Sequence, residues 1–189
     1  MTPYPLSPAL SGLVMGAPFW ALTACTIALG AGPVTSWPAG LPPTRAEHRS
    51  RHGLRIGVIG GVVLAVVSDA SLPRWRLADR WWGYGGGLVL AAAGIALLGS
   101  ARARRDGAMV PTAGPYRVVR YPAYAGILLA ASGLGLALDS WLSLLVGFAV
   151  PLVGLAYRIV VEERALDAAL GVEYARHRDR AARLIPGVW

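Results

Sequence analysis

The chain of 189 residues contains no lysine, asparagine or glutamine, and it has a single cysteine. Without lysine, the chain can form no lysine Schiff base, attach no pyridoxal phosphate and build no lysine-containing phosphate loop. Without asparagine it has no acceptor for N-linked glycosylation. Because Cys25 stands alone, an internal disulfide and a cysteine metal cluster are excluded as well.

Charge is also scarce. Only 15% of the residues are charged, whereas soluble domains usually have about 25%. Hydrophobic residues make up 55% of the chain, and the mean hydropathy is +0.51. This composition indicates a protein that folds in a lipid bilayer.

Five charge-poor segments predict five transmembrane helices, because a bilayer core of about 30 Å needs roughly 20 helical residues. The predicted spans are residues 10–32, 54–72, 81–101, 122–138 and 140–157. The last two are joined by a tight turn at Asp139 and Ser140, which predicts a helical hairpin. We therefore expect an all-α polytopic membrane protein, a single domain over residues 1–189, with a cytoplasmic helix after the fifth span to about Ala182. The first span lacks a preceding basic residue and a clear cleavage site, so a cleaved signal peptide is not expected.

All eighteen basic residues are arginine, and their positions predict the orientation. Cytoplasmic loops carry the excess of basic residues. With the N-terminus outside and the C-terminus in the cytoplasm, only Arg74, Arg76 and Arg80 lie outside, and the other fifteen lie inside. We expect this orientation in the plasma membrane of a bacterium or archaeon. The net charge of +8 is then explained by contacts with lipid headgroups, and nucleic acid is not an expected partner.

Three minor patterns have simple interpretations. The glycine-rich stretch 83–87 lies in an apolar span, so it predicts close helix packing rather than nucleotide binding. Gly57 and Gly61 have the spacing of a packing motif. His48 and His52 are four residues apart, but nearby prolines and a glycine predict a short loop there, and we expect no metal site.

The segment 102–126, between the third and fourth spans, contains three prolines that rule out one continuous helix. An irregular segment at the membrane surface must satisfy its backbone groups on water, protein or a ligand. It is therefore a candidate ligand site. The alternative is a plain basic loop in which Arg117 and Arg120 contact headgroups.

The second candidate segment is the tail 158–189. Helical spacing places Arg158 and Glu162 one turn apart, whereas Glu163 points about 100° away. The pair can form a simple salt bridge that contributes roughly a few tenths of a kcal/mol to helix stability. It can also bind a zwitterionic ligand, because ionisable residues at membrane depth are costly without a purpose.

These two segments carry linked motifs. Residues 114–126 read Gly-Pro-Tyr-Arg-Val-Val-Arg-Tyr-Pro-Ala-Tyr-Ala-Gly, and Glu162-Glu163 follow, with the ending Arg-Leu-Ile-Pro-Gly-Val-Trp at 183–189. The first motif resembles the G-x-Y-R-x-x-R-H-P-x-Y-x-G of the isoprenylcysteine carboxyl methyltransferase family and its phospholipid methyltransferase relatives. The resemblance covers about the last ninety residues.

The resemblance implies a methyltransferase that takes S-adenosylmethionine from the cytosol and a lipid-linked or prenylated acceptor from the bilayer. It implies catalytic functions for Arg158, facing the acceptor's carboxylate, and for Glu162, binding the cofactor. Tyr121 stands where the family usually has histidine. The implied cofactor-binding residues are Ala108, Met109, Val110, Pro111, Tyr116, Tyr121, Pro122, Ala123, Tyr124 and Glu162.

The sequence defines the methyl acceptor less closely than it defines the cofactor. A carboxylate or thiolate attacks a sulfonium methyl group without a base, whereas a phospholipid ammonium must first lose a proton, and no good base stands out apart from water or Glu163. This favours an isoprenylcysteine-type carboxylate. The alternatives are a phospholipid N-methyltransferase, an NADPH-dependent sterol or enone reductase with a similar R-x-P-x-Y-x-G signature, and a non-catalytic scaffold or small transporter.

Overall fold

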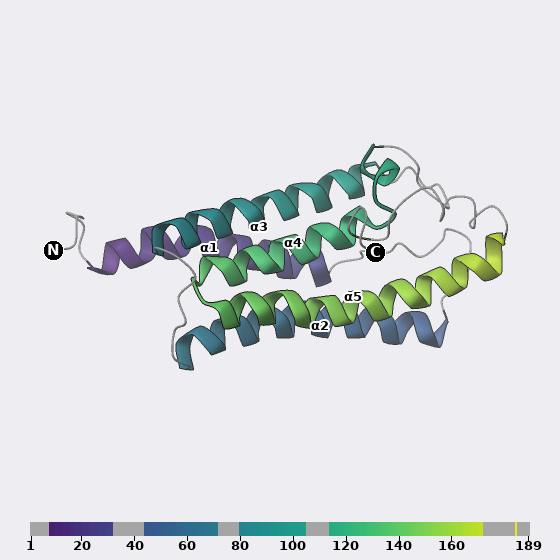
Figure 1. Ribbon diagram of the computed structural model, residues 1–189, viewed down its shortest axis with the longest axis horizontal. Coiled ribbons are helices and arrows are strands. Elements are labelled where there is room, and N and C mark those ends of the chain that lie inside the picture. The colour runs from purple at the N-terminus through teal and green to yellow at the C-terminus, as the bar shows by residue number, and fades with distance from the viewer. Residues whose placement is uncertain (1–7, 32–43, 72–79, 105–113, 172–183, 185–189) are drawn as a thin grey trace.

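The computed structural model describes residues 8–31, 44–71, 80–104, 114–171 and 184. These residues form helices throughout, with no strand in the described ranges, which confirms the predicted all-α fold (Figure 1). The elements are α1 (Pro8–Ala31), α2 (Arg45–Ser71), α3 (Arg80–Ala103), the short 3-10 helix η1 (Gly114–Arg117), α4 (Pro122–Ala137) and α5 (Trp141–Leu170).

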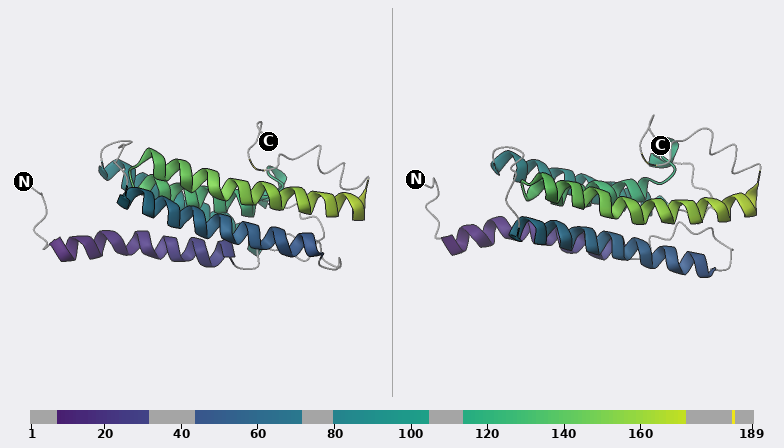
Figure 2. Two further views of the ribbon diagram at one scale, coloured as in Figure 1. Left: turned by 90° about the horizontal axis from the view of Figure 1, so that it is seen from below. Right: turned by 60° about the horizontal axis from the view of Figure 1, so that its bottom comes forward.

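Three helices are long and apolar enough to cross a membrane: residues Arg45–Asp69 of α2, Trp82–Ala103 of α3 and Trp141–Leu170 of α5. Shorter apolar helical stretches cover Gly16–Ala28 and Pro122–Ala137. The helices α1 to α5 alternate in direction along the bundle (Figures 1 and 2). The protein is therefore a polytopic membrane protein, as predicted.

Helix α2 begins nine residues before its predicted span, at Arg45, and the prediction of a short loop around His48 and His52 is wrong. Thr44 caps the helix, because its side-chain oxygen accepts a hydrogen bond of 3.1 Å from the Glu47 backbone N–H. This cap and the packing of α2 outweigh the cost of Gly53 in a helix, about 1 kcal/mol. Both histidines are exposed, and the described residues contain no group of three or more metal-ligating side chains.

Helix α5 continues well past its predicted span and carries the first part of the tail as helix to Leu170. Gly171 ends it with a φ of 52°, a backbone conformation that glycine adopts readily, and its N–H bonds to the Asp167 carbonyl. The rest of the predicted tail helix, up to Ala182, lies outside the described residues. As a result, Arg158 and Glu162 belong to the same rigid helix as the fifth span.

The predicted hairpin between α4 and α5 is present. Asp139 has a φ of 53° and donates its backbone N–H to the Leu136 carbonyl at 2.9 Å. Ser140 then caps α5, since its side chain accepts a hydrogen bond from the Ser143 N–H. Three residues, Leu138 to Ser140, are enough to reverse the chain because Asp139 takes the left-handed conformation.

Helices α3 and α4 pack backbone to backbone. A Cβ added to Gly94 would lie 2.4 Å from the Ala130 nitrogen, and one added to Gly87 would lie 2.3 Å from the Ala137 nitrogen. The predicted packing function of the glycine-rich stretch is confirmed for Gly87. Gly83 instead lies against the Asp139 side chain in the turn after α4, and the glycines at 85 and 86 meet nothing within 4 Å. Small residues let the two helices approach this closely.

Helices α2 and α5 form the second close pair. Gly57 lies against the Val150 carbonyl, and a Cβ on Gly61 would come within 2.6 Å of Pro151. These contacts confirm the packing function predicted for the two glycines. The Ser143 hydroxyl also donates a hydrogen bond of 2.9 Å to the Ala65 carbonyl, which fixes the register of the pair.

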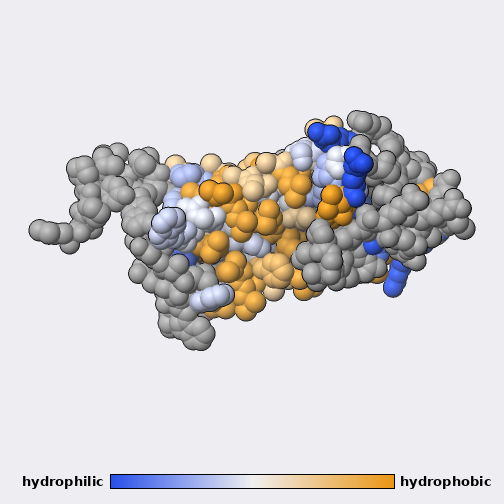
Figure 3. All heavy atoms as spheres, turned by 45° about the horizontal axis from the view of Figure 1, so that its top comes forward, coloured by the Kyte–Doolittle hydropathy of each residue, from blue (hydrophilic) through white to orange (hydrophobic). Residues whose placement is uncertain are grey.

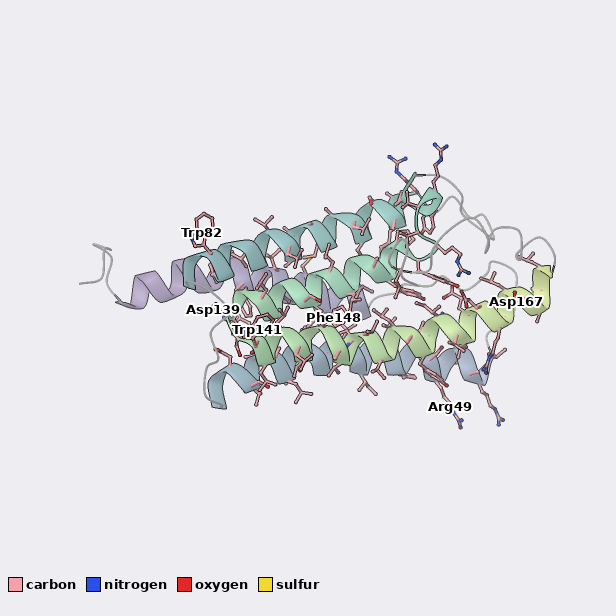
Figure 4. All side chains as sticks on the ribbon, in the orientation of Figure 1. Arg49, Trp82, Asp139, Trp141, Phe148 and Asp167 are labelled. Carbon is pink, nitrogen blue, oxygen red and sulfur yellow. The ribbon has the colours of Figure 1, made fainter. Side chains whose placement is uncertain are left out.

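The surface has an apolar middle and polar ends. Figure 3 shows a broad hydrophobic band over the visible face, with strongly hydrophilic residues toward one end. In Figure 4, Arg49 and Asp167 lie at that end of the bundle, and Trp82 and Trp141 lie at the other. The arginine-rich end therefore contains the start of α2, the end of α3, η1 and the end of α5. The two candidate segments come together at this end (Figure 1).

Candidate functional site

Arg158 of α5 is the centre of the site, and it is only 1% exposed. Its Nη1 donates to the Ser50 hydroxyl at 2.8 Å and to the Glu47 backbone carbonyl at 3.3 Å. Its Nε donates to the Tyr124 hydroxyl at 3.3 Å. Three helices, α2, α4 and α5, thus meet at one guanidinium group.

Two buried carboxylates compensate the charge of Arg158. Glu47 Oε1 lies 3.7 Å from Arg158 Nη2, and Glu162 Oε2 lies 3.9 Å from Nε. Glu47 also forms an ion pair with Arg51. A buried cation needs such partners, because an isolated charge in a low-dielectric environment costs many kcal/mol.

Tyr124 connects the cation to the anion. Its hydroxyl donates to Glu162 Oε2 at 2.9 Å and accepts the hydrogen bond from Arg158 Nε. The Arg158–Glu162 contact of 3.9 Å is long for a direct pair, so the phenol carries much of the connection. The two linked motifs of the sequence therefore meet through Tyr124 and Glu162, which are 38 positions apart.

The neighbouring glutamate has a different partner. Glu163 Oε1 lies 2.8 Å from Arg120 Nη1, and both side chains are largely buried. As the helical spacing predicted, Glu163 and Glu162 point in different directions. The Arg120–Glu163 pair ties the end of the 102–126 segment to α5, which replaces the headgroup contact considered for Arg120.

The tyrosines of the first motif are held in the interior. Tyr116 of η1 donates its hydroxyl to the Ala101 carbonyl at 3.2 Å and so fixes the segment to α3. Tyr121 is the N-cap residue of α4, before Pro122 at the first helical position, where a missing N–H costs nothing. The rings of Tyr121 and Tyr124 stack, with centroids 5.5 Å apart. The tyrosine at the family's histidine position thus lies beside the charged cluster.

The structure brings four predicted site residues into one cluster: Tyr121, Tyr124, Arg158 and Glu162. Pro122 is buried and Ala123 half-buried at the start of α4, and Tyr116 is the buried residue of η1. The remaining predicted cofactor residues, Ala108, Met109, Val110 and Pro111, lie outside the described residues.

Two site residues were not predicted from the sequence: Glu47 and Ser50 at the start of α2. A signal was present, because Thr44-Arg-Ala-Glu47 has the capping-box pattern at a helix start. Glu47 is also the one acidic residue among four arginines between positions 45 and 55. Nothing in the sequence, however, indicates that this segment lies against Arg158, 111 positions away.

Beneath the charges lies an apolar floor. Ile159, Leu155 and Leu98 are almost fully buried there with the two stacked tyrosines, and Leu184 belongs to the same cluster. Leu184 is the one residue of the final motif that the structure describes, and it is 4% exposed in this cluster. This floor excludes water from one side of the cluster, which strengthens its electrostatic interactions.

The fold and the site together define the class of protein: a polytopic helical membrane protein with a buried, charged cluster at the arginine-rich end of its bundle. Residues 87–173 match the family model described as phospholipid methyltransferase. The match runs from within α3 to just past the end of α5, and it is consistent with the membrane methyltransferase family that the motifs predicted. No curated protein matches the chain significantly.

Proposed function

We propose that the protein transfers a methyl group from S-adenosylmethionine to a lipid-linked carboxylate of the isoprenylcysteine type. The observation that supports this most directly is the buried Arg158–Glu162 pair, joined by Tyr124, on residues that match the family. We also propose that the site faces the cytoplasm and that the acceptor enters from the bilayer.

The residues present suit the cofactor. Glu162 offers a buried carboxylate for the ammonium group of S-adenosylmethionine, and its side chain is 2% exposed. Tyr121 and Tyr124 offer aromatic surface, which favours both a purine ring and a cationic sulfonium. Family members generally use this cofactor. When bound, it supplies a methyl group that is activated by the sulfonium.

The residues of the chain then act by position and charge. Arg158 would hold the acceptor's carboxylate near the methyl group, since a guanidinium binds a carboxylate through two parallel hydrogen bonds. A carboxylate is already nucleophilic, so the site needs no base for this acceptor. Correct placement of two reactants supplies up to about 7–11 kcal/mol of barrier reduction.

The test is methyl transfer by the purified protein in lipid nanodiscs, with methyl-labelled S-adenosylmethionine and N-acetyl-S-farnesylcysteine. We expect label in the farnesylated product, released as methanol by mild alkali because a methyl ester hydrolyses. Labelled product that resists alkali would contradict the carboxylate assignment. Absence of transfer to any lipid, with intact binding of S-adenosylhomocysteine, would contradict this acceptor class.

A phospholipid amine is the second candidate acceptor. Two observations favour it: the description of the matched family, and the second buried carboxylate, Glu47, close to Arg158. The amine would have to lose its proton before methyl transfer. Phosphatidylethanolamine vesicles in the same assay distinguish the two cases, since an N-methyl product keeps its label in mild alkali.

The family match favours methyl transfer over the NADPH-dependent reduction and the non-catalytic scaffold that the sequence left open. Thermal unfolding in the presence of each cofactor separates them. We expect S-adenosylhomocysteine to raise the midpoint temperature of unfolding and NADPH to leave this temperature unchanged. The reverse result would favour the reductase.

A further inference from the structure

The start of α2 contributes to the site although it lies outside the residues that match the family. Its Glu47 and Ser50 are fully buried, at 0% exposure, in a stretch that also carries two exposed arginines, Arg45 and Arg49. Both face α5, where they contact the guanidinium of Arg158. This contact joins two segments that the sequence does not connect.

The contacts from α2 hold one side of the guanidinium. The Glu47 carbonyl and the Ser50 hydroxyl accept hydrogen bonds from Nη1, and Glu47 Oε1 lies near Nη2. The opposite side, at Nε, faces the Tyr124 hydroxyl and Glu162. A planar guanidinium contacted at both edges is fixed in its plane, so the direction in which it faces an acceptor depends on the α2 contacts as well as on Tyr124 and Glu162.

The positions of the charges suggest that the two carboxylates, Glu47 and Glu162, have different functions. Glu162 is the proposed ligand of the cofactor's ammonium, so its charge is shared once the cofactor binds. Arg158 is buried and needs a counter-charge at that stage too. Glu47 supplies it from a separate helix, and its Oε2 is buried without a hydrogen-bond partner among the described residues.

The register between α2 and α5 keeps Glu47 in place. Gly57 and Gly61 lie against α5 further along the bundle, and the Ser143–Ala65 hydrogen bond links the two helices near the far end. Close packing of this kind prevents α2 from sliding along α5 without steric clashes. The position of Glu47 is therefore set by the whole length of the helix pair.

We infer that Glu47, supported by Ser50, is a positioning residue for the acceptor: it is the counter-ion that orients Arg158, while Glu162 remains available to the cofactor. This inference rests on the proposed function, because it assigns Arg158 to the acceptor. It extends the site to a helix outside the matched region.

The test compares Glu47→Gln, which removes the charge at nearly constant shape, with Asp69→Asn at the opposite end of the same helix. The probes are S-adenosylhomocysteine binding by calorimetry and steady-state transfer to N-acetyl-S-farnesylcysteine or phosphatidylethanolamine, whichever the wild type methylates. For Glu47→Gln we expect the Kd of S-adenosylhomocysteine to stay within about twofold and kcat/KM for the acceptor to fall at least tenfold, mainly through KM. Asp69→Asn should leave both unchanged.

Two further variants separate positioning from a general loss of structure. Glu47→Asp keeps the charge and should recover part of the lost kcat/KM. Ser50→Ala removes one hydrogen bond to Nη1. It should lower kcat/KM for the acceptor by a smaller factor than Glu47→Gln does. If Glu47→Gln does not fold, Ser50→Ala decides the question alone.

The inference is overturned if Glu47→Gln has the acceptor kinetics of the wild type. It is also overturned if the substitution weakens the binding of S-adenosylhomocysteine as much as it weakens the binding of the acceptor. The second result would place Glu47 in the cofactor site. Failure of the proposed function has a different signature, since the wild-type protein itself would then transfer no methyl group. In the Arg158→Lys background, Glu47→Gln should cause a smaller additional loss, because its effect acts through the guanidinium.

Discussion

At the scale of single residues, the site depends on hydrogen bonds that share one charge among several groups. The Tyr124 phenol donates to Glu162 and accepts from Arg158, so it satisfies an anion and a cation with one hydroxyl. Removal of such a group leaves both charges less well solvated. The sequence predicted that Tyr124 and Glu162 belong to one site, and the structure adds the bond between them.

Glu162 gives the sharpest prediction at this scale. We expect Glu162→Gln to raise the Kd of S-adenosylhomocysteine at least tenfold, about 1.4 kcal/mol, because the amide cannot compensate the ligand's ammonium. Calorimetry on the detergent-solubilised protein measures this. The matched control is Asp167→Asn, an exposed carboxylate further along α5, which should bind normally. Normal binding by Glu162→Gln would remove Glu162 from the cofactor site.

At the scale of elements, glycine spacing decides which helices can touch. Gly94 of α3 and Gly126 of α4 lie so close that a Cβ on either would meet backbone atoms of the other helix within 2.6 Å. Gly126 is also the last residue of the first motif, so its presence there has a packing explanation. The contact holds the start of α4, and with it Tyr124, at the site.

We therefore expect Gly94→Ala to destabilise the protein, by about 1–3 kcal/mol as for other overpacked positions. Gly99→Ala on the same helix meets nothing within 4 Å and should be neutral or slightly stabilising, since alanine favours a helix. Thermal unfolding in detergent compares the two. Equal midpoints for both variants would show that the α3–α4 contact tolerates a methyl group.

At the scale of the whole molecule, Arg49 lies at one end of the bundle, and Trp82 and Trp141 lie at the other (Figure 4). The site lies at the arginine-rich end, and the predicted orientation places that end in the cytoplasm, the side from which the resemblance implies that S-adenosylmethionine enters. The short hairpin of α4 and α5 reverses at the opposite end. The orientation therefore determines which side of the membrane supplies the cofactor.

Labelling of single cysteines tests this orientation in a Cys25→Ser background. A membrane-impermeant maleimide applied to intact cells should modify Trp141→Cys, which is exposed beside the hairpin turn. Arg49→Cys, exposed at the other end, should react only after the cells are made permeable. Labelling with the opposite pattern would show the inverted topology.

The sequence by itself determined the membrane class, the approximate helices and the resemblance to a family, because charge-free runs and short motifs depend on local composition. It also predicted the pairing of Arg158 with Glu162, since both lie on one helix. Only the tertiary structure decided that Glu47 and Ser50 face Arg158 and that Glu163 pairs with Arg120. These contacts join separate helices, and their register is set by glycine packing along the bundle, which no local pattern around Glu47 contains.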